Sequence, residues 1–423
     1  MRTESRSCDV VVVGSGLAGL TAADRLARKG IDVRALEARS VTGGRVLRGD
    51  EGGDIGAEFV GKPHTALREL ITDLGLQTTS ARLDHGPILW RIAGSTRSSV
   101  LPPGRARELW SLGTALWRLR ARALRLDTDA PWTSPGISEL DSTTLAAWLS
   151  HHGVSPHGLA LADALIGGFA TRPIDDMSAA HAAWWMAAAG GLIAAARSGQ
   201  QYIVPGGAYQ IPQRLTSRLG DRVQREAPVR SISTADGGVE IAANADIWRA
   251  KATIVAVPLP SLPRIVFEPP LAATLHSLSR QLSYGNAVKI AATATVAPPE
   301  RHRSVVGGHP LAIAWRRGRA LAGIATGSVT ADELINDLAS AFGVPADSLT
   351  GVGITDWTHR DYIGGSYLVY RPGQIQRLAP VLRRATTDLV RFAGSDFSFW
   401  PNSMEGAVRS GRDAADALLR VIT

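Results

Sequence analysis

The chain has 423 residues, 45% hydrophobic and 20% charged, a composition typical of a folded protein long enough for two or three domains. Its formal net charge is +8, but the arginines are scattered and no nucleic-acid-binding motif is present, so we expect no nucleic-acid partner. The single cysteine, Cys8, excludes an internal disulfide and a cysteine metal cluster, and we expect no metal site.

Targeting and membrane signals are missing from the sequence. The N-terminus is polar, and the apolar run after it carries no secretory cleavage site. No stretch approaches eighteen uninterrupted apolar residues, so we expect no transmembrane segment. These features predict a cytoplasmic protein.

A nucleotide-binding pattern opens the chain. Asp9–Val13 is typical of a short buried parallel strand, a helix is predicted from Leu20 to about Lys29, and Ile31–Leu36 forms a second strand. The hexapeptide Gly14-Ser15-Gly16-Leu17-Ala18-Gly19 joins the first strand to the helix, which is the context that a G-x-G-x-x-G motif requires. Glu37 stands at the tip of the second strand.

Each part of this pattern has a physical reason. Gly14 permits the tight turn, Gly16 lets the backbone approach a pyrophosphate, and Gly19 lets helix and strand pack closely. The free N–H groups of the helix N-terminus attract phosphate, and Glu37 can accept hydrogen bonds from a ribose. The segment therefore predicts dinucleotide binding, with Ser15 and Ala18 among the contacts.

A second glycine pair follows in the run Glu37-Ala38-Arg39 to Gly43-Gly44-Arg45, where a guanidinium can pair with phosphate oxygens. Here the sequence resembles the flavin amine oxidase family, which includes monoamine and polyamine oxidases. The resemblance implies FAD, with Ala38, Arg39, Gly43, Gly44 and Arg45 beside its diphosphate and flavin. It also implies an α/β fold, in which a Rossmann-like FAD-binding domain of the GR2 type is interwoven with a substrate domain of mixed sheet plus helices.

Changes in composition and in predicted secondary structure along the chain divide it into these two domains. We expect the FAD-binding domain to be discontinuous, with residues 1–76, 204–282 and 351–423. The substrate-binding domain would take residues 77–203 and 283–350.

Further cofactor contacts are implied by the same resemblance. Glycine-dense Gly56-Ala57-Glu58-Phe59 matches a run that lies along the flavin, although Glu58 is alternatively a satisfied surface acid. Val229, in a Pro-Val pair, matches a residue whose backbone meets the adenine.

The middle of the chain is predicted to be helical. Arg105–Leu126 has one apolar face and many arginines, which favours an ordinary packed helix, with a membrane-surface or partner-binding helix as the alternative. Asp141-Ser142 is predicted to cap a helix ending near His152. Ser178 begins an apolar helix with His181, Trp184, Trp185 and Met186, which either roofs the substrate cavity, as in the family, or packs in the core.

Three candidate reactive residues lie farther along the chain. Lys289 lies on a predicted strand, where a lysine usually faces solvent, but in the family the lysine of this strand holds a water against flavin N5. Trp357 and Ser366 match a block beside the flavin ring, and Ser366 replaces the cysteine that bonds covalently to flavin in monoamine oxidases. Non-covalent FAD is therefore expected. Tyr367 matches one of two aromatic residues that sandwich the substrate amine.

The C-terminal segment completes the predicted site. Gly394, Ser395 and Asp396 end a strand, and the last helix opens around Ser403, Met404 and Ala407, with its positive end toward the flavin. Ser403 occupies the position of the second sandwiching tyrosine. Phe397, Phe399 or Trp400 are candidates to compensate for its loss.

These residues predict an oxidase that removes hydride from a carbon next to an amine nitrogen, giving an imine while molecular oxygen becomes hydrogen peroxide. The half-missing aromatic cage favours a secondary, tertiary or bulky amine. The alternatives are an L-amino-acid oxidase or a flavin-dependent desaturase, and, from another class, a non-catalytic flavoprotein. Arg172 is the one candidate clamp for a substrate carboxylate. The oligomeric state stays open, with a homodimer among the options.

Overall fold

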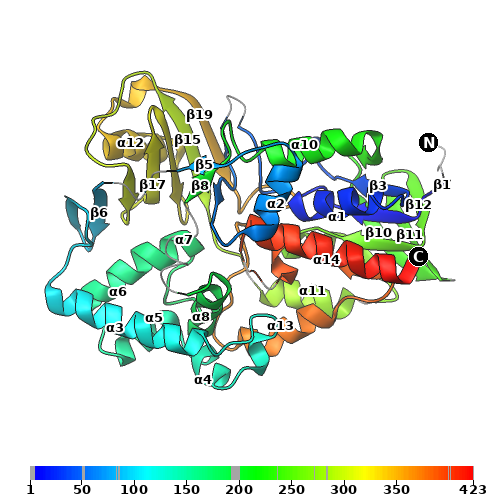
Figure 1. The fold of residues 1–423 in the computed structure, drawn as a ribbon, viewed down its shortest axis with the longest axis horizontal. Coiled ribbons are helices and arrows are strands. Elements are labelled where there is room, and N and C mark those ends of the chain that lie inside the picture. The colour runs from blue at the N-terminus through cyan, green and yellow to red at the C-terminus, as the bar shows by residue number, and fades with distance from the viewer. Residues whose placement is uncertain are drawn as a thin grey trace.

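The computed structural model describes residues 5–49, 53–81, 83, 86–191, 201–235, 237–270, 272–282, 284–398, 400 and 402–422. In Figure 1 the first and last helices lie together in the right half of the molecule, whereas the left half has a sheet above and a layer of helices below. This arrangement is mixed α/β, as the sequence predicts.

A parallel five-stranded sheet forms the centre of the right half. Its strand order is β20 (Val390–Phe392), β13 (Ala252–Val255), β2 (Val10–Val13), β3 (Val33–Leu36) and β9 (Val223–Gln224). All four residues of β2 and of β13 are buried, which explains why both strands are continuous apolar runs rather than alternating ones.

The two faces of this sheet have different coverings. Val10 and Val12 pack with α1 (Leu17–Ala27), α10 (Gln210–Leu219) and α14 (Met404–Ile422). Val11 and Val13 face a second five-stranded sheet, whose order is β1 (Ser5–Ser7), β12 (Asp246–Ala250), β11 (Gly238–Ala243), β10 (Val229–Ala235) and β14 (Val266–Glu268). The remaining elements here are a short sheet and two helices: β4 (Phe59–Val60), β8 (Tyr202–Ile203), β5 (Thr79–Ser80), α2 (Thr65–Asp73) and α11 (Ala272–Gln281).

A seven-stranded sheet forms the upper left of Figure 1. Its order is β19 (Leu349–Asp356), β15 (Val288–Ala294), β18 (Ala320–Ala325), β17 (Leu311–Arg317), β16 (Ser304–Val306), β6 (Ile88–Ile92) and β7 (Ser95–Ser99). Helix α12 (Ala331–Phe342) packs on it and starts with a capping box between Thr330 and Glu333.

The helical layer lies below this sheet. It contains α3 (Ala106–Ala123), α4 (Ile137–Asp141), α5 (Leu145–His151), α6 (Pro156–Ala162), a π-helical turn (Asp163–Gly167), α7 (Gly168–Ala170), α8 (Ala179–Ala188) and α13 (Gln374–Arg384). Among the described helices, none is long and apolar enough to cross a lipid bilayer.

Local details differ from the sequence predictions in three places. Helix α1 begins at Leu17 and not at Leu20, because Gly16 is already its N-cap. Thr144 caps α5, whereas Asp141 is buried at the end of α4, where its carboxylate accepts from the Ser178 hydroxyl. The sequence Trp315-Arg316-Arg317-Gly318-Arg319 predicts a turn between two strands, but the turn is shorter, because β17 continues to Arg317 and only Gly318 and Arg319 turn.

The predicted division into domains stays a prediction, but the pairing of the strands concerns one predicted boundary, the one at residue 351. Strand β19 begins just before residue 351, the predicted start of the third FAD-binding segment, yet it pairs with β15 in the seven-stranded sheet. We therefore place β19 with the substrate-binding part.

Candidate active site

One cavity of about 510 Å³ runs from the parallel sheet to the helical layer. All the cofactor and catalytic candidates from the sequence line it except Ser15 and Gly19. Those that line it are Gly14, Gly16, Ala18, Glu37, Ala38, Arg39, Gly43, Gly44, Arg45, Gly56, Ala57, Glu58, Phe59, Val229, Lys289, Trp357, Ser366, Tyr367, Gly394, Ser395, Asp396, Ser403, Met404 and Ala407. The fold thus brings together residues from five distant stretches of the chain.

The glycine turn between β2 and α1 leaves no room for a side chain at Gly14 or Gly19. Gly14 has φ of +98°, and a Cβ atom added to Gly19 would lie 2.0 Å from the Gly14 carbonyl oxygen. Gly16 pairs with Gly43 as a parallel bridge, and a Cβ on Gly44 would lie 3.1 Å from the Gly16 Cα. Two backbone segments therefore meet at the N-terminus of α1, which has neither a side-chain cap nor an acidic residue in its first turn.

This end of the cavity fits a dinucleotide. Glu37 accepts hydrogen bonds from the backbone N–H of Ser15 (2.9 Å) and of Arg39 (3.0 Å), and its two oxygens keep lone pairs for a ribose. Within the described residues, the buried Ser15 Oγ and one terminal nitrogen of Arg39 have no hydrogen-bond partner. Buried polar groups normally have partners, so these donors, together with the uncapped helix, suit the phosphates of FAD.

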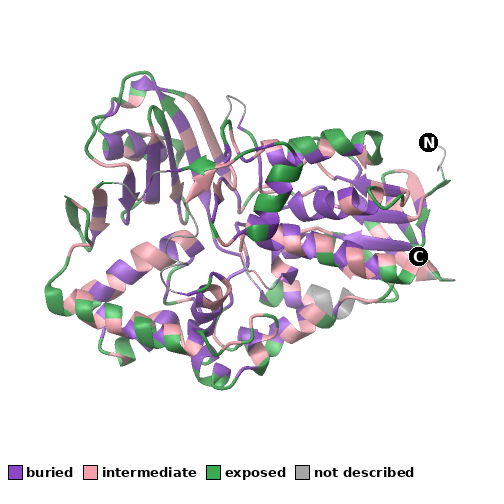
Figure 2. Ribbon diagram, in the orientation of Figure 1, coloured by how far each residue is buried: buried purple, intermediate pink, exposed green. Residues whose placement is uncertain are grey.

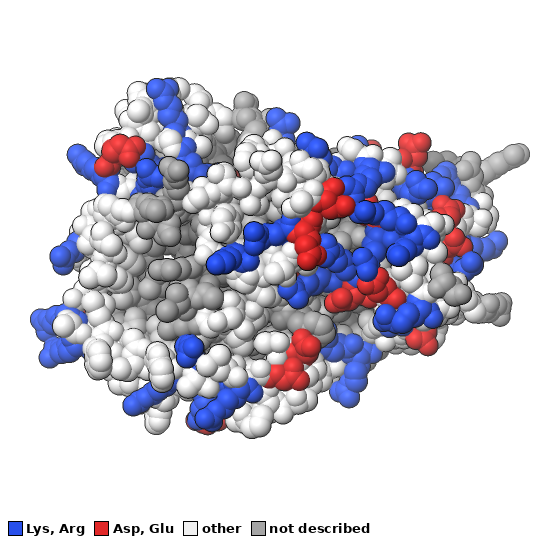
Figure 3. All heavy atoms as spheres, viewed as in Figure 1, with Lys and Arg blue, Asp and Glu red and all other residues white. Residues whose placement is uncertain are grey.

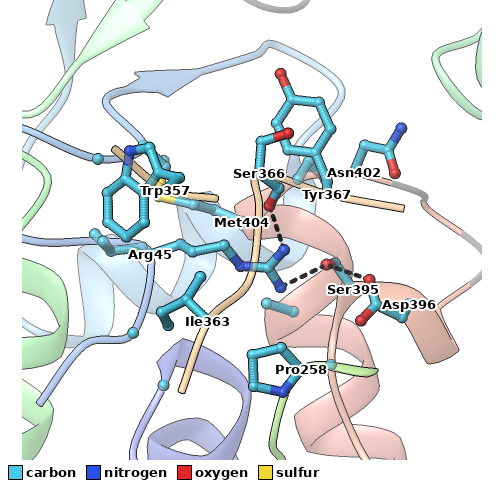
Figure 4. Close-up of a pocket in the computed structure, with 18 of the residues that line it drawn as sticks. Arg45, Pro258, Trp357, Ile363, Ser366, Tyr367, Ser395, Asp396, Asn402 and Met404 are labelled. Carbon is cyan, nitrogen blue, oxygen red and sulfur yellow. Dashed lines mark hydrogen bonds between the residues drawn. The ribbon is translucent and has the colours of Figure 1, made fainter. Parts of the chain in front are cut away.

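Arg45 ties the N-terminal and C-terminal parts of the site together. Its guanidinium donates to the Ser366 carbonyl oxygen and, at 3.4 Å, to the Ser395 hydroxyl, as Figure 4 shows. It also lies 5.2 Å from the centre of the Tyr284 ring. The predicted phosphate contact of Arg45 stays a prediction.

Tyr284 is a component that the sequence analysis missed. Its hydroxyl donates to the Asp396 carboxylate and accepts from the Leu259 N–H, and burial raises its pKa well above the ordinary value, as does the Asp396 carboxylate. It lies four residues before Val288, the first residue of β15, and no local pattern marks it, because its partners are distant in sequence.

Lys289 is buried at the cavity wall, so the alternative of a solvent-facing lysine is wrong. Its ammonium donates to Glu58 Oε2 and to the Gly56 carbonyl oxygen, each at 2.8 Å, and lies 5.3 Å from the Trp315 ring centre. An ammonium has three donors, so among the described residues one N–H is left for a ligand or a water.

Glu58 is also buried, which excludes the surface acid considered from the sequence. It contacts Lys289, the Arg317 guanidinium (2.5 Å) and the Trp315 indole N–H (3.3 Å). Burial alone would raise the pKa of Glu58, but Lys289 and Arg317 outweigh burial and hold that pKa below its ordinary value. The cluster therefore consists of one carboxylate between two cations.

The other end of the cavity is apolar. No described residue that α3 to α8 contribute to the lining is charged, and the set is Leu112, Leu116, Leu119, Ala162, Leu165, Ile166, Phe169, Thr171, Ala182, Trp185 and Met186. Trp185 and Met186 thus roof the cavity, whereas His181 and Trp184 are buried beside it.

Tyr367 connects the two ends, because it lies beside Ser366 at the cofactor end (Figure 4) and bonds to Phe169 of the helical layer. Its hydroxyl donates to the Phe169 carbonyl oxygen, and burial raises its pKa to about 12. The proton is therefore held in place, so Tyr367 can orient a substrate with its ring but is a poor acid or base.

Ser403 has a structural role that the sequence analysis did not predict. Its hydroxyl accepts from the Gly406 N–H and so caps α14, while the residue also lines the cavity. Of the candidates for the missing aromatic residue, Trp400 lines the cavity and Phe397 instead stacks on Phe392 in the core. Phe399 lies outside the described residues.

The predicted carboxylate clamp is wrong. Arg172 does not line the cavity, and its guanidinium donates to the Asp176 carboxylate and, at 2.7 Å, to the Tyr284 carbonyl oxygen. A neighbouring acid thus holds this arginine away from the substrate end.

Two buried histidines complete the surroundings. Burial lowers the pKa of His64, at the cofactor end, to about 4, and its Nδ1 accepts from the Gly61 N–H at 2.9 Å. Burial lowers the pKa of His181 to about 3, with a further contribution from Arg172, and its Nε2 lies 3.2 Å from the Asn402 amide nitrogen. Both imidazoles are therefore neutral near pH 7. Within the described residues, no group of His, Cys, Asp and Glu is arranged to hold a metal ion.

Comparisons with known proteins agree on one family. The family model for flavin-containing amine oxidoreductases matches residues 17–419. AofH of Mycobacterium tuberculosis, which carries the name of a flavin-containing monoamine oxidase, is 31% identical over 96% of this chain and 95% of its own length. Human flavin-containing amine oxidase B is 27% identical over 99% of this chain and 87% of its own.

Two solved structures have the same fold. Cyclohexylamine oxidase from Brevibacterium oxydans superposes with a TM-score of 0.87 at 27% identity, over 98% of this chain and 99% of that one. Putrescine oxidase bound to putrescine superposes with a TM-score of 0.89 at 23% identity, over 98% of this chain and 100% of that one.

Proposed function

The chain belongs to the family of flavin-containing amine oxidoreductases, and on that premise we propose that it oxidises a bulky, apolar amine at the carbon next to nitrogen. It is an FAD-dependent oxidoreductase acting on amines. When bound, FAD supplies the acceptor for the hydride that leaves the carbon, and oxygen then takes the two electrons and two protons to become hydrogen peroxide. A primary or secondary amine, having lost a hydride and a proton, leaves as an imine. A tertiary amine has no N–H, so it leaves as an iminium ion and the second proton of the peroxide comes from solvent.

One observation carries the choice of substrate: the apolar wall of α3 to α8 faces Tyr367 without a charged side chain among the described residues. Hydride loss requires a free nitrogen lone pair, hence a neutral amine. An apolar wall disfavours the protonated form by desolvation, so it selects the reactive one. A second ammonium, as in a diamine, would lack a carboxylate partner at this end.

The side chains have separate roles in this proposal. Tyr367, fixed through Phe169, orients the nitrogen with its ring. Lys289 directs one N–H into the cavity, where it can hold a water, and Glu58 keeps that ammonium in position. The helices that cover the substrate end exclude bulk water.

A coupled peroxide assay tests the substrate class. The purified enzyme would be offered cyclic secondary amines, N-methylated arylalkylamines, benzylamine, putrescine and L-amino acids at matched concentrations. We expect kcat/KM to be highest for the bulky secondary and tertiary amines. A preference for putrescine or for an amino acid would overturn the assignment, and reduction of FAD without peroxide would exclude oxygen as the acceptor.

We also propose that the FAD is held without a covalent bond. Ser366 occupies the linking position, and its hydroxyl donates to the Gly285 carbonyl oxygen (2.9 Å) and contacts Thr171 Oγ1 (2.6 Å). A hydroxyl cannot form the thioether, and this one already has protein partners. Acid precipitation should release all the flavin into the supernatant, whereas yellow colour retained by the washed pellet would disprove it.

A further inference from the structure

The outer surface of α3 carries an unusual concentration of apolar side chains. Nine large hydrophobic residues are exposed among those described, and five of them lie between residues 100 and 124: Val100, Leu101, Trp110, Trp117 and Leu124. Trp110 is 75% exposed and Trp117 62%. In Figure 2 exposed and buried residues alternate along this helix, as expected for a helix with one face inward.

Three of these residues form a straight row. Trp110, Trp117 and Leu124 are seven residues apart, and seven residues make close to two full helical turns, so the three side chains project from the same side over about 20 Å. The opposite side of the helix buries Leu112, Ala115 and Leu119. We call the row the α3 stripe.

Positive charge flanks the α3 stripe. Arg107, Arg118 and Arg125 are exposed. Their separations of eleven and seven residues are close to three and two whole helical turns, so they form a second row beside the first. The acid of the helix, Glu108, is used in the N-terminal capping box with the Arg105 N–H. Figure 3 shows basic atoms and few acidic ones at the lower left of the molecule, where α3 lies in Figure 1.

We propose that the α3 stripe and its arginines dock the enzyme on an anionic lipid surface. Tryptophan and leucine beside arginine on one helix face are the combination that lies in a bilayer interface, with the indole rings at the level of the headgroups. Each basic residue near such a surface contributes about 1 kcal/mol at physiological salt. The helix would lie on the membrane and would not cross it.

A second copy of the chain fits this face less well. Pairing two α3 stripes would bring two rows of arginines together, and like charges across an interface oppose association. The stripe is also a convex row of two indole rings and a leucine on a helix, and not a groove for a peptide. An anionic bilayer satisfies both the apolar row and the charge.

Docking would place the cavity beside the lipid. The inner face of α3 contributes Leu112, Leu116 and Leu119 to the substrate end, one helix diameter of about 10 Å from the stripe. If the proposed function holds, apolar amines concentrated in a membrane would then be close to the cavity. The docking itself does not depend on that function.

The test is sedimentation of the FAD-loaded enzyme with vesicles, which measures binding independently of activity. Vesicles of phosphatidylglycerol and phosphatidylcholine (1:1) would be compared with pure phosphatidylcholine, at low and at high salt. We expect binding to the anionic vesicles, at least tenfold weaker binding to the neutral ones, and loss of binding at high salt.

Two double variants assign the surface. Trp110→Ser/Trp117→Ser and Arg107→Ser/Arg118→Ser should each weaken binding at least tenfold, with unchanged flavin content. Arg222→Ser/Arg225→Ser is the matched control. It removes the same charge from two exposed positions that flank β9, and it should bind like the wild type. Failure to bind anionic vesicles, or equal loss in the control, would overturn the assignment. A wild-type dimer that the tryptophan variant makes monomeric would assign the stripe to a second copy instead.

Discussion

At the cofactor end of the cavity the inward-facing groups include backbone atoms of glycine turns and charged side chains such as those of Glu37, Arg45 and Lys289. At the substrate end they are leucine, phenylalanine, tryptophan and methionine side chains from helices. The first end must match the fixed shape and charge of one cofactor, so single atoms matter there. The second must only be apolar and of suitable size, and many combinations of side chains meet that requirement.

The comparison predicts that substitutions at the cofactor end have much larger effects. Gly19→Ala should abolish FAD binding, because the new Cβ would lie 2.0 Å from the Gly14 carbonyl oxygen and would force the turn open. Gly30→Ala is the control, because its φ is +81° and no atom lies within 4 Å of the added Cβ. It should lose only about 1–2 kcal/mol of stability through backbone strain. The ratio of FAD to purified protein measures FAD binding by the two variants. Normal FAD content in Gly19→Ala would contradict this prediction.

A second prediction concerns the buried charges. Glu58→Gln should lower the free energy of unfolding by roughly 3–5 kcal/mol, because it leaves the Lys289 and Arg317 cations without their shared buried carboxylate. Glu240→Gln removes an exposed carboxylate that pairs with the exposed Arg249 and should have little measurable effect. Urea unfolding of both FAD-free proteins measures this. Equal stabilities would mean that Glu58 has no structural role.

The two ends also differ in how far the sequence predicts them. The cofactor end follows from local spacing, because Gly14, Gly16, Gly19 and Glu37 are tied to one strand–turn–helix unit whose geometry fixes the residue types. The fold class, the FAD cofactor and the family are confirmed. Lys289 and Tyr367 were found only through the resemblance.

The rest of the site depends on contacts between distant segments, for which the sequence has no local signal. Glu58 meets Arg317, and Tyr284 meets Asp396, across more than a hundred residues. Arg172 shows the opposite case, in which a residue predicted for the site is absent from it. Its guanidinium pairs with Asp176, four residues away, and the presence of an arginine in the sequence does not show where its side chain points.

A third prediction concerns the pH dependence of stability at the cofactor end. The folded His64 has a pKa of about 4, whereas the unfolded imidazole titrates near 6.5, so between these values the unfolded state binds more protons. Stability is therefore complete above pH 6.5 and falls on acidification, by roughly 3 kcal/mol for His64 at pH 4. His64→Asn keeps an acceptor for the Gly61 N–H and should make this slope shallower, while His181 keeps its own contribution. His151→Asn, at an exposed position, is the control and should leave it unchanged. Thermal unfolding from pH 4 to 8 gives the slopes, and a slope in His64→Asn equal to that of the wild type would refute this origin.

The smallest effect is expected at the border between the ends. Ser403→Tyr restores an aromatic ring opposite Tyr367 but also removes the hydroxyl that caps α14, at a cost of about 1 kcal/mol. Ser403→Ala removes the same cap without adding a ring, so the difference between the two variants isolates the ring. We expect kcat/KM of Ser403→Tyr to fall severalfold for a bulky tertiary amine and to rise severalfold for benzylamine, relative to Ser403→Ala. The effect should stay small because an apolar wall of many side chains can adjust around one ring. If both variants have the same amine preference, the open side at Ser403 does not select the substrate, and selection must come from the α3 to α8 wall alone.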